Sequence, residues 1–487
     1  MSSPKSSPAK TNGLLGNFVW KFAERISAQF ISLIVAIQLA RLLDPVDFGA
    51  IAMVEIFIAL ANVFVVDGFG SALIQKKDAD AIDFSSVLYA NLIFSVAIYA
   101  ALFFSAPYVA SFYGEGYDVL TPVLRVLGLR LILAAVNSVQ QAYVSRKMIF
   151  RKFFWATLIG TIVSAIVGLA MAYSGYGVWA LVGQYLTNTT VNTIVLAITL
   201  KKRPILAFSC ARLKSLLQFG IKILSTNLLI VGYMRLRALI IGKLYSSEDL
   251  AFYQRGAQFP DLLVNNVNSS LSSVLFPKLS NLQDDLSSVR DVMQRSIRFS
   301  SFVLFPLLFC LCVVARPLVE LVLTEKWAPC VPLLQLLCVS EMFRPLQTIN
   351  VQAIKALGKS GVVFALEVVK KMIELISLLL VMRISVYAIV VNMAALSLFF
   401  TFVNAYPNRR LLGYSYLAQI RDLSPAILRS TAMACAVALL GLAPICAWIL
   451  LPLQAVVGCF FYLALAYATK SKELLFALDH MKKLAKR

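Results

Sequence analysis

The amino-acid sequence predicts an all-α polytopic membrane protein of about 14 transmembrane helices, with two parallel six-helix lobes around a central cavity and two further C-terminal helices. Of the 487 residues, 60% are hydrophobic, and the mean hydropathy is +0.81. Only 14% are charged, well below the roughly 25% that is usual in soluble domains. A soluble fold of this length could not bury so much apolar sequence.

The first predicted span covers residues 16–43, and at a rise of about 1.5 Å per residue it is long enough to cross a bilayer. Its polar residues recur at helical spacing and form one stripe: Lys21, Arg25, Gln29 and Ser32. A polar stripe inside a membrane is costly unless it faces protein or water, so we expect it to line the cavity. Lys21 and Arg25 taken alone could equally well be long cations that reach back to the lipid headgroups.

The other apolar stretches divide the chain into two halves. The first half continues with predicted spans near 48–73, 82–106, 120–145, 152–173 and 177–199. The second half has spans near 216–242, 250–276, 297–315, 331–356, 361–382 and 386–405, followed by two more near 424–448 and 450–469. We therefore expect the following segments: a disordered cytoplasmic tail (1–13), an N-terminal lobe (14–200), a basic linker (201–215), a C-terminal lobe (216–405), a cytoplasmic loop (406–423), two additional helices (424–469) and a basic tail (470–487).

The distribution of basic residues sets the predicted topology. With the N-terminus inside, the inner loops and tails carry 29 Lys and Arg residues, whereas the outer loops carry five. Cytoplasmic loops are the ones enriched in Lys and Arg, so both termini are expected in the cytoplasm. The formal net charge of +21 is explained by these loops, and no motif indicates a nucleic-acid partner.

An internal repeat supports two lobes of the same orientation. The segment LLDPVDFGAIA (42–52) resembles LYSSEDLAFYQ (244–254), and GVWALV (177–182) resembles SVYAIV (385–390). A third pair joins residues 122–127 to 332–337. The offsets are 202, 208 and 210, so the order is kept across six spans. Because six is even, both copies enter from the same side and form a parallel repeat.

The span near 250–276 carries the most regular polar face. Its polar residues step by 4, 3, 4, 3 and 4 positions along one side of a helix: Gln254, Gln258, Asp261, Asn265, Asn268 and Ser272. Amides and hydroxyls at this spacing suit sugar hydroxyls, which need many donors and acceptors. Interhelical hydrogen bonding is the competing interpretation, and we favour the cavity face.

Several cations within the spans are candidates for binding an anionic group. Lys222 enters its span much as Lys21 enters the first, and Arg344 follows Glu341 by three residues, so a purely structural salt bridge competes there. The predicted substrate-binding residues are Lys21, Arg25, Lys222, Arg344, Arg130, Arg255, Gln254, Gln258, Asn265 and Asn268. Glu55, Asp67 and Asp261 are candidates for ion coupling, although Glu55 and Asp67 could instead be partners of these cations.

Catalytic and metal sites are not expected. The eight cysteines form no CxxC pair and are interpreted as small hydrophobic residues, and the one histidine, His480, is in the terminal tail. This argues against a catalytic triad and a zinc site. No Walker A or dinucleotide motif is present where it would be needed, so no cofactor is expected. The acidic pair Asp284–Asp285 is weak support for a metal-dependent transferase, which stays as an alternative hypothesis.

Six segments resemble one known family, the polysaccharide-export branch (Wzx-like and colanic-acid-type flippases) of the multidrug/oligosaccharidyl-lipid/polysaccharide exporter superfamily. The similar segments are LARLLDPVDFGAIAM (39–53), DGFGSALIQKK (67–77), YGVWALV (176–182), IIGKLYSSEDLAFYQRG (240–256), VLFPKLSNLQDD (274–285) and EKWAPCVPLLQLL (325–337). The resemblance spans about residues 14–410 and departs from the family pattern at Ala251, Gln254 and Gly256.

This resemblance implies a V-shaped, two-lobed transporter in the inner membrane of a bacterium that works by alternating access. Its expected substrate is an undecaprenyl-diphosphate-linked oligosaccharide, moved from the inner to the outer leaflet for O-antigen, capsule or exopolysaccharide synthesis. The energy source would be a proton or sodium gradient. Expected partners are the lipid-linked oligosaccharide and membrane lipids, with a polysaccharide polymerase and chain-length components as further candidates. An ion-coupled exporter of drugs or small solutes, from the same superfamily, is the alternative.

Overall fold

The computed structural model describes residues 29–67, 73, 80–200 and 207–475. Within this part of the chain the regular structure is helical, which confirms the predicted all-α class. The chain divides into two compact units, residues 1–251 and 252–487. Each unit is compact in itself.

Nine helices in the described part of the chain are long and apolar enough to cross a membrane, which confirms a multi-pass membrane protein. They are Pro45–Val66, Ala81–Tyr113, Leu120–Lys147, Phe150–Tyr173, Leu224–Leu244, Leu286–Val313, Val386–Leu412, Tyr416–Leu440 and Ala447–Ala468. Of the first predicted span, a helix from Gln29 to Leu42 is described. The count of fourteen spans and the predicted segment boundaries remain predictions.

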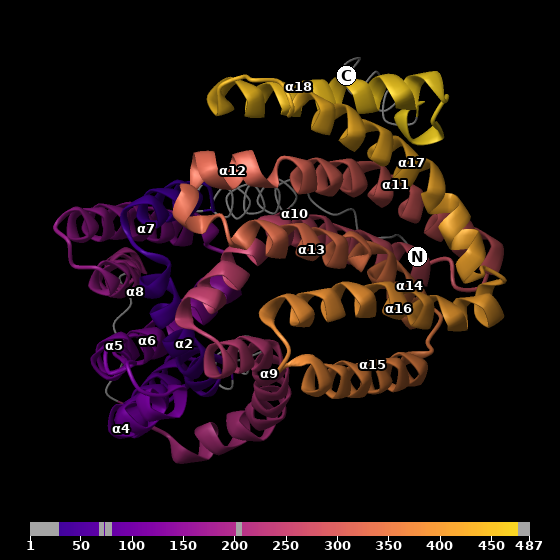
Figure 1. Cartoon of the computed structure of the whole chain (residues 1–487). Coiled ribbons are helices and arrows are strands. Elements are labelled where there is room, and N and C mark those ends of the chain that lie inside the picture. Colours follow the sequence, from indigo (N-terminus) through magenta and orange to yellow (C-terminus); the bar gives the residue numbers. More distant parts are fainter. Residues whose placement is uncertain (1–28, 68–72, 74–79, 201–206, 476–487) are drawn as a thin grey trace, which may run out of the picture. The chain divides into compact units, whose positions relative to one another are not determined.

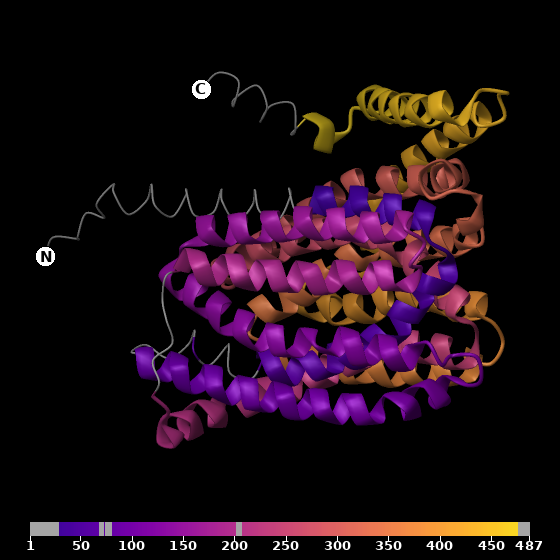
Figure 2. The same ribbon diagram turned by 90° about the vertical axis from the view of Figure 1, so that its left-hand side faces the viewer.

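The first unit consists of long helices packed alongside one another (Figure 2). In chain order they are α2 (Pro45–Asn62), the π-helix η1 (Val63–Asp67), α4 (Ala81–Tyr113), α5 (Leu120–Gly128), α6 (Arg130–Lys147), α7 (Phe150–Tyr173), α8 (Val178–Leu200) and α9 (Cys210–Leu244). Helices α7 and α8 pack together as a hairpin. Their connection is tight because Gly175 and Gly177 adopt positive φ angles of 77° and 54°, which L-residues with side chains rarely adopt.

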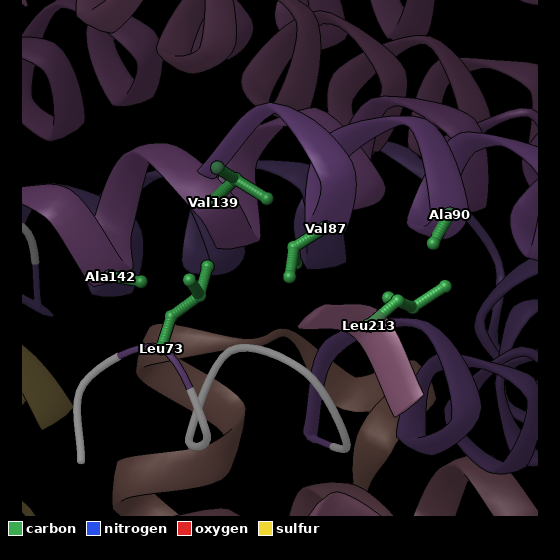
Figure 3. Close-up of a cluster of buried hydrophobic side chains, with 6 residues drawn as sticks. All are labelled: Leu73, Val87, Ala90, Val139, Ala142 and Leu213. Carbon is green, nitrogen blue, oxygen red and sulfur yellow. The ribbon is translucent and has the colours of Figure 1, made fainter. Parts of the chain in front are cut away.

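An apolar cluster fixes three of these helices against one another (Figure 3). Val87 and Ala90 of α4, Val139 and Ala142 of α6 and Leu213 of α9 form this cluster together with Leu73, and all six are buried. At the same end of α4, Asp80 accepts hydrogen bonds from the Ile82 and Asp83 amides. Asp80 also forms an ion pair with Arg212, with 2.5 Å between Oδ2 and Nη1. The Arg212 guanidinium, together with these amides, lowers the pKa of Asp80 to about 2.

The second unit contains α10 (Ser247–Ser280, of which the first residues belong to the first unit), α11 (Leu286–Val313), α12 (Ala315–Val322), the 3₁₀ helix η2 (Glu325–Trp327), α13 (Cys330–Met342), α14 (Arg344–Ala356), α15 (Ser360–Val381), α16 (Val386–Leu412), α17 (Tyr416–Leu440) and α18 (Ala447–Ala468). Helix α11 packs against α17 and α13 against α16 (Figure 1). The last two helices are attached through Tyr462 of α18, which donates a 3.0 Å hydrogen bond to the Phe302 carbonyl of α11.

The internal repeat is visible at the starts of α2 and α10. The Asp44 amide donates to Asp47 Oδ2 at 3.3 Å, and 202 residues later the Ser246 amide donates to Asp249 Oδ2 at 3.2 Å. Both are arrangements in which a carboxylate three residues into the helix satisfies a free amide at its N-terminus. Asp47 and Asp249, which align in the sequence repeat, therefore have the same capping role in both copies.

Two spans that the sequence predicts as continuous are broken. The span near 120–145 is divided at Leu129 into α5 and α6, and the span near 331–356 is divided at Phe343 into α13 and α14. In the second case Pro345 has no amide hydrogen for the Glu341 carbonyl, so the helix restarts there. In the first case Gly128 precedes the break, and glycine disfavours a helix interior. Each second half begins with an arginine.

Candidate functional site

The arginine at the first break is ion-paired across the first unit. Arg130, the first residue of α6, donates a hydrogen bond to Glu55 of α2, and the two side chains are 26% and 25% exposed. The guanidinium also lies 5.1 Å from the centre of the Tyr185 ring of α8. A predicted substrate cation and a predicted coupling carboxylate are therefore brought together, and their charges balance one to one.

Polar residues further along α6 bind the neighbouring helix α8. Asn137 Nδ2 donates to Asn192 Oδ1 at 3.2 Å and to Thr193 Oγ1 at 3.4 Å, and Gln140 Nε2 donates to the Thr193 carbonyl at 3.3 Å. Gln141 donates to Asn137 on its own helix. The polar face that follows Arg130 is thus used mainly for hydrogen bonds between helices, as is common in membrane proteins.

The arginine at the second break lies between two carboxylates of the second unit. Arg344 Nη1 is 2.7 Å from Glu341 Oε2 and 3.6 Å from Asp261 Oδ1 of α10. The side chains of Arg344 and Asp261 are 43% and 47% exposed, whereas Glu341 is 17% exposed. Two negative charges face one positive charge, so this cluster, called here the Arg344 cluster, carries one uncompensated carboxylate when all three residues are ionised.

The two ion pairs correspond to one another in the repeat. The offset of 202 for the second span of each lobe places the counterpart of Glu55 at position 257, one helical turn before Asp261. The offset of 210 for the fourth span places the counterpart of Arg130 at position 340, one turn before Arg344. In the second unit, the acidic residue and the arginine therefore both lie one helical turn after the positions that the repeat predicts. In each unit, an acidic residue of the second span contacts the arginine that begins the second half of the broken fourth span.

The residues of the predicted polar face of α10 have different surroundings. Arg255 Nη1 donates to Gln258 Oε1 at 2.7 Å, and its guanidinium lies 5.4 Å from the centre of the buried Trp327 ring. Asn265 is exposed and Gln254 half-buried. Asn268 has a buried Oδ1 that lacks a hydrogen-bond partner among the described residues. Part of the face is thus bound within the unit, whereas Asn265 is exposed.

Some predicted site residues are not characterised by the structure. Lys21 and Arg25 lie outside the described residues. Lys222 belongs to α9 and Asp67 ends η1, but their side chains are outside those that the structure describes. The proposed roles of these four residues remain predictions.

A buried amide cluster escaped the sequence analysis. Asn350 of α14 and Gln419 of α17 exchange two hydrogen bonds of 2.8 and 3.0 Å, and Asn408 of α16 donates to Asn350 Oδ1 at 2.7 Å. All three residues are fully buried. Their positions on three different helices hide them from any search for one polar face, although a lone amide on an apolar helix is itself a signal for an interhelical partner.

Comparisons with known proteins agree with this architecture. The family model described as "Polysaccharide biosynthesis protein" matches residues 38–332. The succinoglycan biosynthesis transport protein ExoT of Rhizobium meliloti is 23% identical over 72% of this chain and 70% of its own. The teichuronic acid biosynthesis protein TuaB of Bacillus subtilis is 22% identical over 73% and 74%, and the lipopolysaccharide biosynthesis protein WzxC of Escherichia coli is 25% identical over 64% of each chain.

Solved structures share the fold. The lipid II flippase MurJ in an inward closed conformation superposes with a TM-score of 0.73 over 93% of this chain and 98% of its own, at 13% identity. An inward-facing multidrug resistance transporter of the MATE family, in the MOP superfamily, gives 0.57 over 83% and 95%, at 14% identity. These likenesses bear on the fold alone, whereas the family model covers more than half of the sequence. The chain is therefore a multi-pass membrane protein that belongs to the polysaccharide biosynthesis protein family.

Proposed function

We propose that the protein is a flippase that moves an undecaprenyl-diphosphate-linked oligosaccharide from the inner to the outer leaflet, for the synthesis of a surface polysaccharide such as O-antigen, capsule or exopolysaccharide. The observation that carries the proposal is the Arg344 cluster, which keeps partly exposed charges within the helices of a protein of this family. Ionisable groups inside membrane helices are costly, and they commonly mark the path of a polar substrate.

The relatives support a transport step on a lipid-linked saccharide. ExoT is named as a transport protein of succinoglycan biosynthesis, and MurJ as a flippase of lipid II. Moving such a substrate requires a polar path for the sugar, while the polyprenyl tail can stay in the hydrocarbon. In alternating access the two lobes would open this path first to one side and then to the other.

The diphosphate is proposed to be held by cations and the sugar by amides. Lys21, Arg25 and Lys222 are the proposed first contacts for the diphosphate, with Arg344 as a further contact. On α10, Gln254, Asn265 and Asn268 would hydrogen-bond sugar hydroxyls. Arg130 and Arg255 are already engaged with Glu55 and Gln258, so we assign them to positioning the helices.

The Arg344 cluster offers a simple link between substrate and a proton or sodium ion. A diphosphate that bound Arg344 would compete with Asp261 and Glu341 for the guanidinium. A carboxylate released in this way would favour binding a cation, because its positive partner would be gone. Among the described candidates for ion coupling, Asp261 is therefore the proposed residue, whereas Glu55 has an arginine of its own.

The proposed setting is the inner membrane of a bacterium, as the family resemblance implies, and the basic loops predict both termini in the cytoplasm. A polysaccharide polymerase and chain-length components would act on the product after it reaches the outer leaflet. They are proposed partners for that reason. The protein itself is proposed to make or break no covalent bond.

Export of small cationic solutes is the second candidate. The uncompensated carboxylate of the Arg344 cluster favours it, since a cationic solute would be attracted to a site that carries excess negative charge. The fold shared with a multidrug transporter is compatible with it. The basic residues predicted at the cytoplasmic mouth argue for the anionic substrate instead.

The two candidates separate in a proteoliposome assay. A fluorescent polyprenyl-diphosphate oligosaccharide is reconstituted with the protein, and its movement is measured by access to an impermeant quencher, with and without proton and sodium gradients. Movement faster than in protein-free vesicles, reduced in a Lys21→Ala/Arg25→Ala/Lys222→Ala variant, is the expected result. Uptake of small organic cations, with no movement of glycans of several compositions, would overturn the proposal in favour of the exporter.

A further inference from the structure

A cavity in the second unit lies between the C-terminal half of α10 and the middle of α11, and no residue of the Arg344 cluster lines it. Its volume is about 530 Å³, within the usual range for ligand sites. Helix α10 contributes residues from Asn266 to Lys278, and α11 contributes residues from Val292 to Val303. None of the lining residues is acidic, and Lys278 is the cation among them.

The walls of this cavity are suited to hydrocarbon. Val274 and Phe299 are 66% and 45% exposed, so apolar side chains are presented to whatever fills the space. Serine hydroxyls in the walls form hydrogen bonds with backbone carbonyls of their own helices. Ser270 Oγ donates to the Asn266 carbonyl at 2.9 Å, and Ser300 Oγ donates to the Ile297 carbonyl at 3.1 Å. With these donors satisfied, the walls offer few polar partners to water.

The length and the charge of the cavity indicate the kind of molecule that fits. From Asn266 to Lys278 a helix rises about 18 Å, close to the roughly 15 Å hydrocarbon depth of a single leaflet. Lys278 is exposed at the end of α10, and its side chain has no ion pair or hydrogen bond among the described residues. An apolar groove that is one leaflet deep and ends at a free ammonium matches one acyl chain with a phosphate headgroup.

We propose that this groove is a binding site for an acidic glycerophospholipid, with an acyl chain between α10 and α11 and the headgroup phosphate on Lys278. The predicted topology puts Lys278 in the cytoplasmic leaflet, where anionic lipids are attracted to basic residues. The polyprenyl chain of the proposed transport substrate is much longer than one leaflet is deep, so the bulk phospholipid is the better fit. The site does not depend on the proposed transport function.

The test is retention of lipid by the whole protein. The protein is extracted from nanodiscs of phosphatidylcholine that contain a minor fraction of phosphatidylglycerol, and the lipids that remain bound are counted by native mass spectrometry. We expect the wild type to retain phosphatidylglycerol selectively. Lys278→Ala should lower this retention about fivefold, and Lys278→Arg should restore it. Ser270→Trp should exclude both lipids by filling the groove.

Matched controls guard against general effects. Lys359→Ala removes an exposed cation outside the groove, and Ser269→Trp adds the same bulk at an exposed neighbouring position that does not line it. Both should retain phosphatidylglycerol as the wild type does. Retention that is unchanged in Lys278→Ala and Ser270→Trp would overturn the proposal, as would displacement of the bound lipid by polyprenyl phosphate at concentrations at which phosphatidylglycerol does not compete.

Discussion

Arg344 Nη1 lies 2.7 Å from Glu341 Oε2, although a break in the helix separates these two residues. The contact survives the break because α14 restarts after one residue and keeps Arg344 about one turn beyond Glu341. The same guanidinium also faces Asp261 at 3.6 Å. A salt bridge that could have been purely local is thereby tied to α10, and its charge balance depends on three helices.

Removal of Arg344 should impair transport more than stability. In Arg344→Ala two carboxylates lose their only cation in the cluster, and we expect translocation to fall by about tenfold or more. The stability loss should be about 1 kcal/mol, because the guanidinium is 43% exposed and solvent screens the charges. The rate is measured in proteoliposomes and the stability by thermal unfolding. Arg316→Ala, which removes a 77% exposed arginine paired with Glu320, is the control, and equal rates in the two variants would contradict the role of Arg344.

The Glu55–Arg130 pair should behave as a structural unit. We expect Glu55→Gln and Arg130→Gln each to destabilise the protein by about 1–3 kcal/mol, because each leaves a partly buried charge without its partner. The double variant should lose less than the sum of the two, with a coupling energy of about 1–2 kcal/mol. Unfolding of all four proteins under one set of conditions measures this coupling. Strictly additive effects would show that the two side chains do not interact.

The dependence of the translocation rate on a proton or sodium gradient should require Asp261 and not Glu55. Asp261→Asn leaves Arg344 balanced by Glu341 alone, so the cluster becomes neutral and loses the carboxylate that we propose for coupling. We expect this variant to lose any dependence of the translocation rate on a proton or sodium gradient. Glu55→Gln should keep that dependence even where its overall rate is reduced. A gradient dependence that disappears only in Glu55→Gln would reverse the assignment.

Much of this architecture can be predicted from the sequence, because long apolar segments indicate membrane helices. The capping residues Asp47 and Asp249 and the contact between Glu341 and Arg344 follow from short-range spacing, which a helix fixes. The pairing of Glu55 with Arg130 is different, since 75 residues separate them. Sequence alone left open whether Glu55 binds an ion or a cationic side chain, because that choice depends on which helices pack together.

The helix breaks and the amide cluster show the same limit. Pro345 is a signal for a helix start, yet only one residue separates the two helices, so the sequence is interpreted as one span. Asn350, Asn408 and Gln419 come from α14, α16 and α17, and each is unremarkable within its own helix. Only the three-dimensional packing shows that they bind one another.

The buried amide cluster should contribute more to the free energy of unfolding than an exposed amide contact does. Gln419→Leu removes two hydrogen bonds of the buried Asn350 amide, which keeps its bonds to Leu346 and Asn408, and the loss should cost about 1–3 kcal/mol. Gln335→Leu removes an exposed amide that donates to the Cys312 carbonyl at 2.9 Å, and it should cost about 0.5 kcal/mol. Denaturation in one detergent compares the two. A larger loss in Gln335→Leu would contradict the importance of burial.

Gly49 of α2 should tolerate no side chain, because a Cβ atom there would lie 1.9 Å from the Ser247 carbonyl oxygen at the start of α10. The obstacle is backbone and cannot rotate away, so Gly49→Ala should destabilise the protein by about 1–3 kcal/mol. Gly361 of α15 is the matched control, since no atom lies within 4 Å of a Cβ built there. Gly361→Ala should be neutral or should stabilise its helix by up to about 1 kcal/mol. Thermal unfolding of both variants measures the difference, and equal midpoints would mean that α2 and the start of α10 can separate without cost.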